Sequence, residues 1–212
     1  MILMCAVAFF PFDAASRELL LPMLPTQLLW INVVASVALA LPLAFEAKEP
    51  NVMSRPPRRP DEPVFSSFVV MRTFVAAILM TAGAIGLFLY EYDVSSGDDA
   101  ALARTQTMAV STVVMFQIFY MLNCRSLRDS IFKIGFFSNP AVFLGVGAVL
   151  VLQLAFIYAP FMQEIFGTAP LSARDFSLSV LAGMIILPVI SIEKIIRTRA
   201  ARPGENLAPS PP

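Results

Sequence analysis

Five apolar stretches, each close to 20 residues long, run through this chain and limit what it can fold into. A helix of about 20 apolar residues spans the roughly 30 Å hydrocarbon core of a bilayer. The stretches do not alternate polar and apolar residues, as the strands of a membrane barrel do. The sequence therefore predicts an all-α fold, a polytopic transmembrane helix bundle, with full spans at about 24–45, 68–90, 105–123, 141–161 and 176–192.

The first ten residues are apolar but too few to cross a membrane. They run from Met1 to Phe10 and stop at Pro11, which is about half a span. A signal peptide needs a positively charged start, and the first Lys or Arg is Arg17. We expect an N-terminal half-span, the outer half of a helix whose cytoplasmic half is missing, so that the chain is a fragment or a separately encoded piece.

The composition excludes several classes of function. Charged residues make up 14% of the chain, the net charge is zero and there is no His, whereas soluble domains carry about 25% charged residues. A neutral chain offers no basic surface for nucleic acid. Cys5 and Cys124 are isolated and have no metal-ligand spacing. We expect the lipid bilayer as the surroundings, and no cofactor in this chain.

The basic residues indicate the orientation, because Lys and Arg gather in cytoplasmic loops. Only Arg17, Arg104 and Arg174 fall on one side of the predicted spans. The other twelve fall on the opposite side: Lys48, Arg55, Arg58, Arg59, Arg72, Arg125, Arg128, Lys133, Lys194, Arg197, Arg199 and Arg202. We therefore place the loops 46–67 and 124–140 and both chain ends in the cytoplasm of a bacterial cell, with the spans in its inner membrane. The Pro-rich residues 203–212 predict a disordered tail.

Polar side chains inside the spans are the functional candidates, because they are costly in hydrocarbon. Asn32 and Ser36 are four residues apart and share a helix face. Pro42 frees the carbonyl of Ala38. In the third full span, Gln117, Tyr120 and Asn123 follow one another in steps of three along one face. These oxygens could line an ion site, or they could only hydrogen-bond to neighbouring helices. No Asp or Glu lies in the middle of a span, which argues against an autonomous carrier of divalent cations.

Four motifs carry a resemblance to a known family. They are Leu24-Pro25-Thr26-Gln27-Leu28-Leu29-Trp30-Ile31-Asn32, Asn51-Val52-Met53-Ser54-Arg55-Pro56-Pro57-Arg58, Thr107-Met108-Ala109 and Leu187-Pro188-Val189-Ile190-Ser191-Ile192-Glu193-Lys194. Their order and spacing resemble the C-terminal membrane region of cation-transporting P-type ATPases of the calcium-pump-like branch, from the end of the fifth helix to the tenth. The resemblance implies that residues 1–202 form that membrane domain.

The resemblance also suggests an ion-pathway role for Asn32, Ser36, Gln117 and Asn123. Asn32 and Asn123 match the family, while Ser36 and Gln117 stand where calcium pumps carry Asp and Glu. Both carboxylates that this region would supply to a calcium site are therefore absent, and the ion is not identified.

The chain has no Asp-Lys-Thr-Gly phosphorylation motif and no Gly-rich phosphate cradle. No residue is therefore expected to be catalytic, and the chain cannot hydrolyse ATP by the family's mechanism on its own. We expect a module of the ion pathway whose partners are the catalytic part of a P-type ATPase and a transported cation. The alternative is a small stand-alone membrane protein that scaffolds or regulates a partner by helix packing.

Overall fold

The computed structural model describes residues 21–45, 67–94, 99–124 and 139–201, and within them every regular element is helical. The elements are α2 (Pro25–Trp30), η1 (Ile31–Ser36), α3 (Val37–Leu43), α4 (Ser67–Val94), α5 (Asp99–Cys124), α7 (Pro140–Tyr158), α8 (Pro160–Phe166), α9 (Ala173–Met184) and α10 (Ile186–Ala201). The segment η1 is a π-helix that joins α2 and α3 into one continuous helix.

Within the described residues, five helical stretches are long and apolar enough to cross a membrane. They are Pro25–Leu43, Val69–Tyr92, Asp99–Cys124, Pro140–Tyr158 and Ala173–Glu193. The all-α bundle with five full spans is therefore confirmed. Three predicted parts lie outside the described residues: the half-span, residues 46–66 of the loop 46–67, and the tail 203–212.

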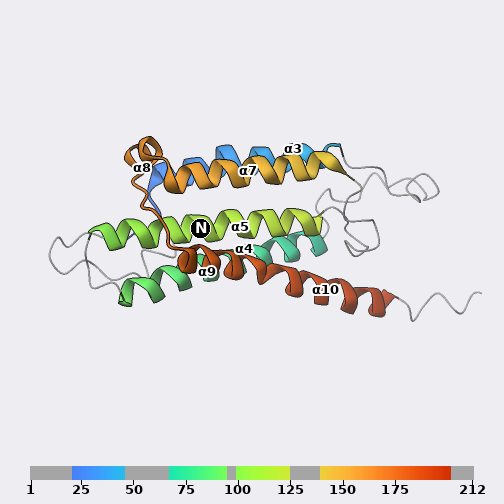
Figure 1. Cartoon of the computed structure of the whole chain (residues 1–212). Coiled ribbons are helices and arrows are strands. Elements are labelled where there is room, and N and C mark those ends of the chain that lie inside the picture. Colours follow the sequence, from blue (N-terminus) through green and yellow to red (C-terminus); the bar gives the residue numbers. More distant parts are fainter. Residues whose placement is uncertain (1–20, 46–66, 95–98, 125–138, 202–212) are drawn as a thin grey trace, which may run out of the picture.

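The long helices run roughly alongside one another, with α5 in the middle (Figure 1). The continuous helix α2–η1–α3 packs against α7 on one side of α5, and α4 and α9 pack on the other side. Of the α5 span 72% is buried, against 17–31% of the other four spans. The central position explains its composition, because polar residues such as Thr107, Ser111 and Thr112 are kept away from lipid.

The hydroxyls of α5 satisfy themselves within their own helix. Thr107 donates to the Ala103 carbonyl at 2.7 Å and Ser111 to the Thr107 carbonyl at 2.8 Å. Such bonds to the preceding turn let Ser and Thr remain inside a buried helix.

Prolines set where the spans end or break. The predicted span 141–161 is too long, because α7 ends at Tyr158 and Pro160 opens the separate helix α8. Proline disfavours the helical conformation of the preceding residue, and Ala159 is extended with φ −79° and ψ 124°. Pro188 likewise lacks the N–H that would bond the Met184 carbonyl. Helix α9 ends at Met184, and α10 begins at Ile186.

Two other boundaries also differ from the sequence prediction. Helix α5 begins at Asp99 rather than at 105, because the charged residues Asp99 and Arg104 lower the hydropathy of its start. Helix α9 begins at Ala173 rather than at 176, because Ser172 caps it: its hydroxyl accepts from the Asp175 N–H at 3.2 Å.

Two glycines allow neighbouring helices to approach closely. A Cβ at Gly145 of α7 would lie 2.5 Å from Cγ of Pro42 and 2.8 Å from the Ala38 carbonyl oxygen. A Cβ at Gly183 of α9 would lie 2.7 Å from the Phe116 backbone nitrogen. Small residues at such contacts are how membrane helices bring their backbones together.

Candidate ion-pathway site

Asn32 and Ser36 both lie in the π-helical segment η1. The Asn32 side chain is exposed, and its amide donates to the Leu28 carbonyl of its own helix at 3.0 Å. The side chain of Ser36 lies outside the described residues, although its backbone is part of η1. A π-turn replaces the usual i→i+4 bonds by i→i+5 bonds and is common at functional sites. The sequence predicted a shared face here but gave no sign of the π-turn.

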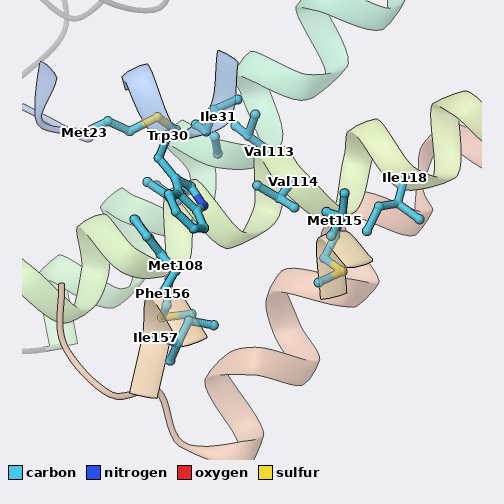
Figure 2. Close-up of a cluster of buried hydrophobic side chains, with 14 of the residues drawn as sticks. Met23, Trp30, Ile31, Met108, Val113, Val114, Met115, Ile118, Phe156 and Ile157 are labelled. Atoms are coloured by element: carbon cyan, nitrogen blue, oxygen red, sulfur yellow. The ribbon is translucent and has the colours of Figure 1, made fainter. Parts of the chain in front are cut away.

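Gln117 of α5 places an amide oxygen inside the bundle. Its Oε1 atom is buried and has no hydrogen-bond partner among the described residues. Gln117 is three helical turns beyond Gln106, whose amide donates to the Leu21 carbonyl at 2.8 Å just before α2. It also shares its face with Val113, which lies in one buried cluster with Ile31 of η1 (Figure 2). Gln117 is therefore on the side of α5 that faces the π-helix.

The three polar residues in steps of three do not share one environment. Tyr120 packs against a second buried cluster that includes Ala76 of α4 and Ile190 of α10, and its polar neighbours are Arg72, Thr73 and Cys124. Asn123 is buried at 2% exposure. Because each residue advances a helix by about 100°, every step of three turns the row by about 60°. Gln117 and Asn123 therefore do not point in the same direction, and the hydrogen bond of the Asn32 side chain stays within its own helix.

A hydrogen-bonded bridge fixes the π-helix to its neighbours. The indole N–H of Trp30, the residue before η1, donates to Oε1 of Gln153 at 3.3 Å. The amide of Gln153 donates to the Ser111 hydroxyl at 3.2 Å, so that the bridge reaches α5. The Trp30 ring also stacks on Phe156, with 4.8 Å between ring centroids (Figure 2). Sequence reasoning missed Gln153, although it is the only amide in its apolar span and intramembrane polar residues are functional candidates.

The segment from the end of α8 to the start of α9 is held by hydrogen bonds to three other helices. The Gln27 amide of α2 donates to the Phe166 carbonyl at 3.1 Å. The Ala169 N–H donates to the Thr107 hydroxyl of α5 at 3.0 Å, and the Thr168 hydroxyl donates to the Phe156 carbonyl of α7 at 2.8 Å. The same end of the bundle holds an ion cluster, in which Arg104 pairs with Glu91 and lies 3.6 Å from Asp175.

Comparison with known proteins identifies the architecture. Residues 20–196 match the family model described as cation transporting ATPase, C-terminus. The chain belongs to this family. It is 43% identical to the probable cation-transporting ATPase F of Mycobacterium tuberculosis over 151 aligned residues. The aligned region covers 71% of this chain and 16% of that protein.

Eukaryotic relatives agree with this result. The calcium-transporting ATPase 1 of Yarrowia lipolytica is 35% identical over 154 residues, which is 73% of this chain and 16% of that protein. The calcium-transporting ATPase 1 of Saccharomyces cerevisiae is 33% identical over 174 residues, which is 82% of this chain and 18% of that protein. The chain therefore spans less than a fifth of these relatives, and it is a membrane module of a P-type cation ATPase without catalytic domains in this region.

Within this family module, the described residues offer neutral oxygens rather than charged ones near the π-helix. They contain no group of three or more His, Cys, Asp or Glu side chains placed to hold a metal ion. What α5 and η1 can supply are side-chain amide oxygens. These oxygens suit a partly dehydrated cation when further ligands complete its shell.

Proposed function

We propose that this chain supplies neutral oxygen ligands to the ion pathway of a cation-transporting P-type ATPase, completed by the catalytic part of the pump and needing no cofactor of its own. The observation that carries the proposal is the buried Oε1 of Gln117, which has no hydrogen-bond partner in the described part of the chain. A buried amide oxygen without a partner costs about 1–3 kcal/mol. A cation or its bound water would satisfy this oxygen, and η1 lies on the side that it faces.

The proposed ligands favour a weakly charged cargo. Asn32, Ser36, Gln117 and Asn123 carry no charge, and affinity for Ca²⁺ follows the number of charged oxygen ligands. We therefore propose a monovalent cation or a proton as the transported ion, unless helices supplied by the catalytic part add carboxylates. Of the four, Asn32 and Gln117 have the strongest support: Asn32 lies in the π-turn, and Gln117 on the face toward it.

The proposal predicts a change in ion dependence in a chimeric pump. Residues 20–196 would replace the matching C-terminal region of the Mycobacterium tuberculosis relative, and cation-stimulated ATP hydrolysis would be measured in proteoliposomes. Replacing Gln117 by Leu should raise the half-saturating cation concentration about tenfold, which corresponds to a loss of about 1.4 kcal/mol of binding free energy. Asn32→Ala should act in the same direction, and Ser36→Asp with Gln117→Glu should raise affinity for divalent cations.

Gln163→Leu is the matched control. Gln163 is a glutamine as well, but its side-chain amide donates to the Ile157 carbonyl at 2.7 Å, at the junction of α7 and α8. Its replacement should leave the ion dependence unchanged. If Gln117→Leu and Asn32→Ala both keep the parental ion dependence in a folded chimera, the ion-pathway proposal is wrong and a packing role remains.

We also propose that the module lies in the bacterial inner membrane with both ends in the cytoplasm, on the strength of the twelve-to-three division of basic residues. Single cysteines at positions 54 and 96, in a background without Cys5 and Cys124, would be treated with a membrane-impermeant thiol reagent on intact spheroplasts. Ser96→Cys should be labelled and Ser54→Cys should react only after permeabilisation. The reverse pattern would overturn this orientation.

A further inference from the structure

The π-helical segment η1 lies between two hydrogen-bonded contacts that both come from α7. Before η1, Trp30 donates to Gln153 and stacks on Phe156. After η1, the Asn139 amide at the start of α7 donates to the Pro42 carbonyl at 3.3 Å. All five of these residues are buried. One helix therefore fixes both ends of the stretch that contains the π-turn.

Both contacts depend on the rotational position of the helix. The first needs the indole of Trp30 to point at α7, and the second needs Pro42 to lie against Gly145, where a Cβ would be only 2.5 Å from its ring. A regular α-helix advances about 100° per residue. Changing one residue in the spacing between Trp30 and Pro42 would therefore turn one of the two residues away from α7.

A π-turn contains one residue more than an α-turn, because each of its hydrogen bonds spans i→i+5 instead of i→i+4. The π-turn allows the chain between Trp30 and Pro42 to hold an additional residue while both remain directed toward α7. Short π segments are rare and occur mostly as single turns inside α-helices, frequently at functional sites.

We propose that Gln153 and Asn139 are positioning residues of α7 that hold Ile31–Ser36 in the π register, and that this register is what presents the Asn32 segment to the ion pathway. The part about the ion pathway rests on the proposed function. The part about the register does not, and it can be tested without any ion.

The test compares two single-residue deletions in the full chain in detergent micelles. Val33 is exposed and lies within η1, and Gly147 is exposed and lies between the two contacts on α7, in a regular helix. Deleting Val33 should convert η1 to α-helix with both contacts kept, so the midpoint of thermal unfolding should equal or exceed that of the parent. Deleting Gly147 should lower it, because α7 has no π-turn to absorb the change.

A second readout uses Trp30, the only tryptophan in the chain. With the π-turn present, Gln153→Met should release Trp30 from α7 and shift its fluorescence emission to longer wavelength. In the variant that lacks Val33, the same substitution should leave the emission nearly unchanged, because no π-turn remains to relax. Gln153→Glu, which keeps an acceptor for the indole, should restore much of the parental emission.

The proposal is overturned if deleting Val33 lowers the unfolding midpoint as much as deleting Gly147. An equal shift of Trp30 emission by Gln153→Met in both backgrounds would also overturn it, since that result describes an ordinary packing contact. Either failure leaves the ion-pathway proposal to be decided by the Gln117 and Asn32 variants of the chimera.

Discussion

Replacing Arg104 by Met should destabilise the module by about 3 kcal/mol, because it removes the cation that faces two buried carboxylates. Arg104 begins the second turn of α5, where it pairs with Glu91 of α4 and lies 3.6 Å from Asp175 of α9. Both carboxylates are only 1% exposed, whereas the Arg104 side chain is 34% exposed. Breaking a buried ion pair typically costs 3–5 kcal/mol, and the partial exposure of Arg104 places the expected value at the lower end. Reversible unfolding in detergent mixtures would measure the change.

Arg174→Met is the matched control, since Arg174 is an exposed arginine at the start of the same helix as Asp175. Its effect should stay within about 0.5 kcal/mol. Adding Glu91→Gln and Asp175→Asn to Arg104→Met should recover most of the loss, because no buried negative charge then lacks a cation. A loss at Arg104 no larger than that at Arg174 would show that the cluster does not hold the three helices together.

Gly183→Ala should destabilise the contact between α9 and α5 by about 1–3 kcal/mol, the usual cost of overpacking. The added Cβ would lie 2.7 Å from the Phe116 nitrogen and 2.9 Å from the Met115 carbonyl carbon. Because these are backbone atoms of the central helix, no side-chain rotation can make room. The midpoint of thermal unfolding in detergent, followed by Trp30 emission, would report the loss.

Gly86→Ala provides the opposite expectation in the same kind of element. Gly86 lies inside α4, and a Cβ there would meet nothing within 4 Å. Alanine should stabilise that helix by up to about 1 kcal/mol, because glycine has the lower helix propensity. If both alanine variants change the midpoint in the same direction, the close approach at Gly183 does not limit the packing.

Hydropathy was sufficient to place the five spans, because the membrane requires a fixed length of apolar helix. It failed at the ends that depend on local chemistry, such as the start of α9 at its Ser172 cap and the break before Pro160. The Pro160 break was in principle readable from the sequence, since proline restricts the residue before it.

The candidate site was less accessible to sequence reasoning than the spans. Asn32 and Gln117 could be named because polar residues are rare in spans. The π-turn and the bridge through Gln153 depend on which helices are neighbours, and a single sequence does not specify that. For the same reason, the prediction that Gln117, Tyr120 and Asn123 lie along one helix face did not anticipate that Tyr120 packs toward α4 and α10.

The burial of α5 has a consequence for how this chain enters the membrane during synthesis. Its helix is the least apolar of the five spans and carries Arg104 near its start. An arginine is costly to insert, by about 2.5–3.5 kcal/mol at a span centre. Glu91, near the end of α4, is the first partner that the growing chain offers to Arg104. We therefore expect α4 and α5 to leave the insertion machinery together as a helical hairpin, with their opposite charges already paired.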